Sequence, residues 1–115
     1  MKKLILALAI VLFASVSSFA TFWTVRTRAA DIRTAPSSQS AVILTLPRDP
    51  FFSLNEVSRR KGWIKVQFVN FVPRRAFRQM LAEGAAVQEL GYEGGTVQAK
   101  ITGWTRSGNL RRKGS

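Results

Sequence analysis

The chain has 115 residues, which is enough for one small domain. It carries 18 Lys and Arg against six Asp and Glu, so its formal net charge is +12, and it contains neither Cys nor His. Disulfides, Cys-His and Ser-His-Asp nucleophilic sites and the usual zinc sites are therefore excluded. The six carboxylates show no spacing typical of an acid/base pair. We expect a protein that is not an enzyme and holds no cofactor or metal.

Residues 1–20 have the layout of a secretory signal peptide. Lys2 and Lys3 give a positive start, the run from Leu4 to Phe13 is uninterrupted apolar sequence, and Ser18-Phe19-Ala20 places small residues at the two positions that a signal peptidase reads. We expect export to the periplasm or the extracellular space, with cleavage after Ala20. An uncleaved membrane anchor stays open, because residues 4–25 carry no charge and could just span a bilayer.

Cleavage would leave a strongly basic mature chain. It would have 115 − 20 = 95 residues, and loss of Lys2 and Lys3 would lower the net charge from +12 to +10. In a cell envelope, such a surface attracts lipid headgroups, lipopolysaccharide phosphates, teichoic acids or acidic proteins. In the cytoplasm it would attract nucleic acid, an alternative that the signal-like start disfavours.

Short alternating or β-branched runs predict strands joined by close turns. The expected strands are 21–27, 41–46, 51–57, 63–68 and 96–101, followed by a closing element at 103–110 and a basic tail at 111–115. We expect Pro47 and Pro50 to end the second strand, because proline cannot donate to a ladder. The fourth strand alternates cleanly and should bury one face, made of Ile64, Val66 and Phe68, with Lys65 and Gln67 on the other.

One segment instead has near-helical spacing. Pro73 suits a first helical position, and Gly91 a stop. Between them the large apolar residues are Phe77, Met80, Leu81, Val87 and Leu90. We expect a helix through Leu90, and a break near Gly84 stays open, because glycine costs about 1 kcal/mol relative to alanine.

Three motifs together resemble the bacterial Src-homology-3-like family. They are Asp31-Ile-Arg-Thr-Ala-Pro-Ser37, Gly62-Trp63-Ile-Lys-Val66 and Gly103-Trp104. In this family a similar turn opens a small barrel, and two Gly-Trp pairs begin later strands. The resemblance implies a mainly β fold, a small SH3-like barrel over residues 21–110. It also implies a non-catalytic envelope module that binds peptidoglycan peptides or protein partners.

The chain departs from the family pattern in three places, one of which is Asp49-Pro50, where the family tends to have a glycine after a basic residue. Ala35 stands where glycine is usual in the opening turn. The segment from Asn70 to Lys100 replaces what is normally a short connection between two strands. We therefore expect one inserted α-helix at about 70–95.

Trp63, Trp104 and Arg33 are candidate ligand-binding residues. Each tryptophan could form an aromatic floor for a ligand, or could pack inward as the start of a strand. Arg33 could clamp a carboxylate or phosphate, or could brace the opening turn by donating to backbone carbonyls. Both interpretations stay open for each residue.

Arg74, Arg75 and Arg78 complete the candidate binding residues. If the helix lies beside the turn that carries Arg59, Arg60 and Lys61, all six cations would form one basic face; otherwise they are ordinary solvated charges.

These features predict an envelope binding module that recognises a cell-wall component, another anionic envelope component or a protein partner. Two alternatives stay open. One is a membrane-anchored accessory subunit of an envelope complex, with membrane contact through residues 4–25. The other, which we favour least, is a nucleic-acid-binding small barrel.

Overall fold

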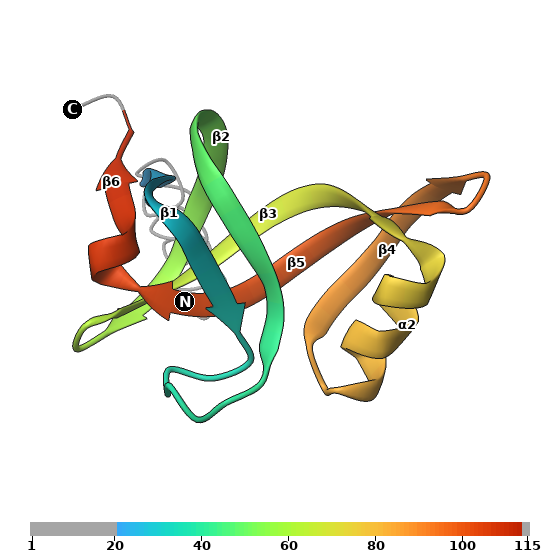
Figure 1. The fold of residues 1–115 in the computed structure, drawn as a ribbon, viewed down its shortest axis with the longest axis horizontal. Helices are drawn as coiled ribbons and strands as arrows, with labels where there is room; N and C mark the ends of the chain where they lie inside the picture. Colours follow the sequence, from blue (N-terminus) through green and yellow to red (C-terminus); the bar gives the residue numbers. More distant parts are fainter. Residues whose placement is uncertain (1–20, 114–115) are drawn as a thin grey trace, which may run out of the picture.

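Six strands, one α-helix and one 3₁₀ turn make up residues 21–113, the part of the chain that the computed structural model describes (Figure 1). In chain order they are β1 (Phe22–Arg33), β2 (Val42–Arg60), β3 (Trp63–Pro73), α2 (Arg74–Ala82), β4 (Ala86–Glu93), β5 (Thr96–Arg106), η1 (Ser107–Asn109) and β6 (Leu110–Arg112). The expected mainly β fold with one helix is confirmed. The predicted signal or anchor segment at 1–20 lies outside the described residues.

All six strands belong to one antiparallel sheet, in the order β4-β5-β3-β2-β1-β6. β1 also pairs with β5 through Arg33 and Trp104, so the pairings of β1, β2, β3 and β5 form a closed circuit. Figure 1 shows β3 and β5 running together from this circuit to the end of the molecule that carries α2 and β4. The molecule therefore has two ends: one is the closed circuit of strands, and the other carries α2 and β4.

The prediction that Pro47 and Pro50 end a strand is wrong. β2 is one strand of 19 residues that runs through both prolines. Its pairing with β1 is irregular here, because Pro47 pairs with Ala29 and Asp49 pairs with Val25, with register shifts on either side of the latter pair. The missing N–H groups fall where the ladder is already broken, so β2 continues past the prolines and its second half pairs with β3.

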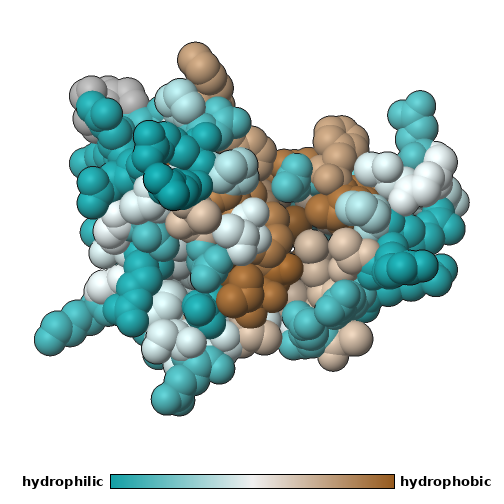
Figure 2. Space-filling model, viewed as in Figure 1, coloured by the Kyte–Doolittle hydropathy of each residue, from teal (hydrophilic) through white to brown (hydrophobic). Residues whose placement is uncertain are grey.

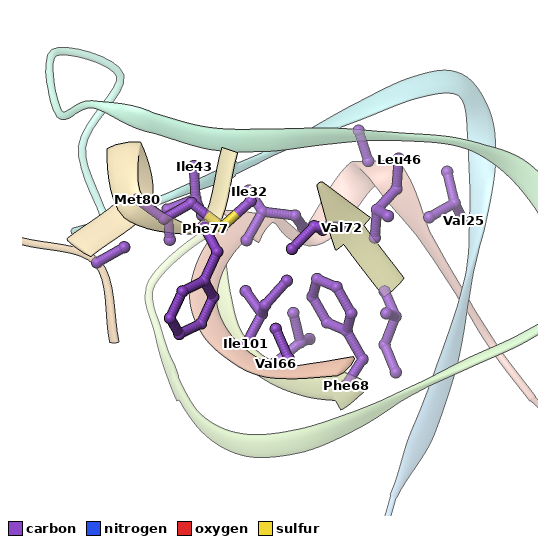
Figure 3. Close-up of a cluster of buried hydrophobic side chains, with 14 of the residues drawn as sticks. Val25, Ile32, Ile43, Leu46, Val66, Phe68, Val72, Phe77, Met80 and Ile101 are labelled. Atoms are coloured by element: carbon purple, nitrogen blue, oxygen red, sulfur yellow. The ribbon is translucent and has the colours of Figure 1, made fainter. Parts of the chain in front are cut away.

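The core lies inside the closed circuit and extends under the helix. Ile64, Val66 and Phe68 are buried while Lys65 and Gln67 are half-exposed, as the alternation predicted. Figure 3 shows side chains from several strands and from α2 in one cluster, which includes Val25, Ile32, Ile43, Leu46, Val66, Phe68, Val72, Phe77, Met80 and Ile101. The helix is thus part of the core and not a separate appendage.

The predicted helix is correct only as far as Ala82 and does not reach Leu90, and the break near Gly84 that the sequence left open is confirmed. Gly84 has φ +79°, and two bonds close the helix end: Gly84 N–H donates to the Leu81 carbonyl (3.1 Å) and Ala85 N–H to the Met80 carbonyl (3.0 Å). This is a Schellman motif, in which glycine takes the left-handed position without strain. The following residues form β4 and pair with β5.

The segment inserted between β3 and β5 is consequently shorter than expected. β3 and β5 stay paired out to Pro73 and Thr96, which leaves α2, β4 and their turns in residues 74–95. The helix packs through Phe77 and Met80, whereas Leu81 is 51% exposed. Figure 2 shows apolar side chains in the middle of this view. Val42 and Ile43 of β2 line a hollow together with Ala76 and Met80 of α2.

Candidate functional site: a face of tryptophans and cations

Trp63 and Trp104 lie on neighbouring strands and on the same face of the sheet. The register pairs Trp63 with Arg106 and Lys65 with Trp104, and residues directly opposite each other point to the same side. Since Ile64 and Val66 alternate with them and are buried in the core, this row faces outward. We call Arg60, Trp63, Lys65, Trp104 and Arg106 the tryptophan–cation face.

Cations cover both indole rings. The Arg106 guanidinium carbon lies 4.6 Å from the centre of the Trp63 ring. Over Trp104, the Arg60 guanidinium carbon lies at 5.9 Å and the Lys65 Nζ at 5.8 Å. Each tryptophan is only 8% exposed, yet neither belongs to the main apolar cluster. The indole rings therefore hold the cations in place by cation–π attraction. Little of either ring is exposed to solvent for direct contact with a ligand.

The three cations of this face have no carboxylate partner within residues 21–113. The two ion pairs in this range join Arg33 to Asp31 (3.7 Å) and Arg59 to Glu56 (2.8 Å). Two like charges over one ring repel each other, and a bound anion would relieve that repulsion. The arrangement is suited to hold an oxyanion such as a phosphate or a carboxylate.

Arg33 adopts the turn-bracing geometry. Its Nη1 donates to the Ser40 carbonyl at 2.7 Å, and its Nη2 lies 3.7 Å from the Asp31 carboxylate. Thr34 N–H also donates to the Ala41 carbonyl at 3.0 Å, so the opening turn is closed by backbone and side chain together. Arg33 sits opposite Trp104 in the register, which places it at the border of the tryptophan–cation face.

Arg74, Arg75 and Arg78 lie elsewhere, and the predicted joint face with Arg59, Arg60 and Lys61 does not form. The turn with Lys61 precedes β3, whereas α2 begins where β3 ends. β3 has 11 residues, which separates the two groups by about 33 Å at 3.3 Å per residue. On α2 all three arginines are exposed, and the Arg74 guanidinium carbon lies 4.9 Å from the centre of the Tyr92 ring.

Glu56 forms the best-defined charged contact of the structure. Arg59 donates to both of its carboxylate oxygens, at 2.8 and 3.1 Å, and Trp23 Nε1 donates to Oε1 at 2.8 Å. The hydrogen bond from Arg59 is the largest cause that holds the pKa of Glu56 below its ordinary value of 4.5; partial burial opposes it, and the Trp23 bond adds to it. The contact ties the start of β1 to the second half of β2.

The lowered pKa of Glu56 predicts a pH-dependent stability. Because the folded state binds this proton less tightly than the unfolded state, the contribution is present above about pH 4.5 and is lost as the pH falls through the lower folded value. At pH 7 Glu56→Gln should cost about 1 kcal/mol, because the Glu56 side chain is 18% exposed but its partner Arg59 is 60% exposed, so that solvent screens the pair. The difference between the two proteins should shrink by pH 3 in urea unfolding curves.

Glu93→Gln controls for the loss of one negative charge, because Glu93 is exposed and lies at the opposite end of the sheet. A Glu56→Gln penalty that is the same at pH 3 and pH 7 would contradict the ionic origin of the contact.

Sequence reasoning found the two tryptophans of the face but missed the cations as a group. Lys65 follows Trp63 by two residues, and Arg106 follows Trp104 by two. A period of two places such pairs on one face of a strand, so the repeated Trp-x-cation spacing was the available signal. Arg60 could not have been added, because its place depends on the register between β2 and β3.

Other kinds of site find no support in the described part of the chain. No group of three or more carboxylates in residues 21–113 could hold a metal ion. No helix in that range combines the length and apolar character needed to cross a membrane. Comparisons with protein-family models, curated proteins and solved structures gave no match for this chain.

Proposed function

We propose that this protein is an exported, non-catalytic binding module, built as an SH3-like barrel, that binds an anionic component of the cell envelope. The tryptophan–cation face is the binding site. The observation that carries the proposal is the set of three cations, Arg60, Lys65 and Arg106, held over two buried tryptophans with no carboxylate partner among residues 21–113.

The closed circuit of strand pairings supports the barrel. β1, β2, β3 and β5 pair in a ring, and β6 extends it along β1. Two motifs of the resemblance agree with the strand order, because the opening turn follows β1 and Gly62-Trp63 begins β3. Gly103-Trp104 does not begin a strand as expected, because β5 runs from Thr96 to Arg106; the pair lies where β5 meets β1. Export is supported by the signal-like layout of residues 1–20.

The geometry suggests how an anion would be held. Stacking on a ring limits the conformations of a long cationic side chain, so less entropy is lost when a ligand binds. Arginine presents a planar fork that can donate two hydrogen bonds to one phosphate or carboxylate, and lysine adds a compact charge. A polymer with regularly spaced anionic groups would engage the three cations together.

A matched pair of triple variants tests the site. Arg60, Lys65 and Arg106 changed to serine should lower retention on anionic wall polymer by more than tenfold at low ionic strength, because each lost contact is charge-assisted. The control triple changes Arg74, Arg75 and Arg78 to serine, which removes the same charge from the other end of β3. It should retain most of the binding in the same co-sedimentation assay.

The control triple also tests our sequence-based assignment of the helix arginines. Equal losses in both triples would indicate attraction by net charge alone, and no loss in either would exclude both groups. Added salt should reproduce the effect of the first triple. Stronger binding to an oligonucleotide than to wall polymer would support the nucleic-acid alternative instead.

The cellular location of the protein is tested by purifying it from its native host and sequencing its N-terminus. A start at Thr21 would support export with cleavage. An intact Met1 in the membrane fraction would support the anchored alternative. An intact Met1 in the soluble cytoplasmic fraction would contradict the proposal.

A further inference from the structure

The end of the molecule where β1 begins combines exposed aromatic rings with cations. Phe51, in the irregular part of β2, is 87% exposed, and Phe22, at the start of β1, is 43% exposed. Lys113 connects the residues around the two rings. Its backbone N–H donates to the Phe22 carbonyl at 2.9 Å, and its Nζ donates to Oγ of Ser53, two residues after Phe51. Figure 1 shows the start of β1, the bend of β2 and β6 on the same side of the molecule.

Three exposed cations accompany the two rings. We call the whole set the β1-entry surface, made of Phe22, Arg48, Phe51, Arg112 and Lys113. Lys113 lies opposite Phe22, whereas Arg112 pairs with Trp23 and so lies on the other side of β6 at the same end of the molecule. Arg48 lies three residues before Phe51 in β2. Exposed aromatic side chains beside cations suit the boundary between water and an anionic bilayer, where the rings enter the headgroup layer and the cations meet lipid phosphates.

Only a short stretch of sequence separates this surface from the apolar N-terminal segment. The last residue of the uninterrupted apolar run is Phe13, and the eight steps from there to Thr21 span at most about 29 Å at 3.6 Å per residue. Thr21 is fixed on the domain, because its carbonyl accepts a hydrogen bond from Glu56 N–H at 2.8 Å. Wherever residues 4–13 enter a bilayer, the start of β1 is held within that distance of the bilayer, and the β1-entry surface is the exposed surface beside the start of β1.

We propose that, in the full-length chain before any cleavage after Ala20, the β1-entry surface docks on the anionic phospholipid bilayer that receives residues 4–20. Phe51 enters the headgroup layer, and Arg48, Arg112 and Lys113 lie against lipid phosphates. This contact goes beyond the wall-polymer site, because the two surfaces share no residue and the only strand that contributes to both, β2, does so through its middle in one case and its last residue in the other. It orients the domain relative to the membrane and leaves the tryptophan–cation face for a second ligand.

The absence of cysteine allows a direct test with the full-length chain, since one introduced cysteine can carry an environment-sensitive NBD label. We place it at exposed Pro50, beside Phe51, and in a separate protein at Gly95, where an added Cβ meets nothing within 4 Å. In vesicles that contain phosphatidylglycerol, the Pro50 label should shift to the blue and be quenched by nitroxide lipids, and salt should weaken both effects. The Gly95 label should remain in water.

Variants identify the contacts responsible. In the protein labelled at Pro50, Phe51→Ser should abolish most of the blue shift, whereas the matched change Phe71→Ser removes a ring that is 67% exposed at the far end and should leave it unchanged. A Pro50 label that stays in water, or labels at Pro50 and Gly95 that respond alike, would overturn the docking proposal. Neither result bears on wall-polymer binding, because the triple variants of the tryptophan–cation face test that separately.

Discussion

Gly103→Ala is expected to destabilise the protein by about 3 kcal/mol, although it adds a single methyl group. A Cβ at this position would lie 2.5 Å from Ile32 Cγ2, 2.9 Å from the Arg33 carbonyl oxygen and 3.0 Å from Ile43 Cδ1. The Arg33 carbonyl belongs to the backbone of β1, and Arg33 makes the pairing of β1 with β5. The clash can be relieved only if the two strands separate, which would open the closed circuit.

Gly95→Ala and Gly108→Ala are matched controls, because an added Cβ at either position meets nothing within 4 Å. Both should stay within about 1 kcal/mol of the parent in urea unfolding curves, and could gain slightly from the reduced entropy of the unfolded chain. Gly103→Ala with the stability of these controls would show that β1 and β5 are not packed as closely as described.

This close approach gives a physical reason for one motif of the sequence. The Gly-Trp pair at 103–104 was recognised by resemblance alone, which assigns no role to the glycine. In the structure the missing side chain of Gly103 leaves room for the backbone of β1 to pack against β5. Trp104 points to the opposite face, where Arg60 and Lys65 lie over its ring. The two residues therefore serve the fold and the candidate site separately.

Secondary structure was predictable where local patterns acted alone. The alternation in β3 gave its buried face correctly, because a period of two needs no knowledge of the neighbouring strands. The prolines of β2 led to a wrong prediction of a strand end. A proline destabilises a strand only where a neighbouring strand needs its N–H group, and that depends on the pairing with β1. Val87 and Leu90 led to a wrong prediction of helix, because apolar residues three apart fit a helix. Only the pairing of β4 with β5 shows that they lie in a strand.

The candidate site was predictable only in part, for a related reason. Trp63 and Trp104 stood out by residue type, but their cover of cations follows from the register between β3 and β5. The expected joint face of the helix arginines does not form because the strand predicted at 63–68 continues to Pro73, which leaves no connection that could return α2 to the β2–β3 turn. A surface shared by several strands needs their register before its members can be grouped.

Val66→Asp is expected to abolish folding at room temperature. Val66 is fully buried in the middle of β3, which pairs with β2 on one side and β5 on the other. Figure 3 shows its side chain within the apolar cluster, near Ile101 and Phe68. An unpaired carboxylate here would have to stay charged without a partner or take up a proton at neutral pH, and either costs several kcal/mol. That is a large part of the roughly 5–15 kcal/mol that stabilises a typical domain.

Lys65→Ala is the matched control for Val66→Asp, because Lys65 is the adjacent residue of the same strand and points to the opposite, half-exposed face. It removes one cation from above Trp104 and should cost less than about 1 kcal/mol. Circular dichroism during thermal unfolding distinguishes the two: Lys65→Ala should show a cooperative transition close to that of the parent, and Val66→Asp should show none. Two variants with the same melting temperature would mean that the faces of β3 are assigned the wrong way round, and the outward position of Trp63 and Lys65, on which the proposed binding face depends, would be lost with them.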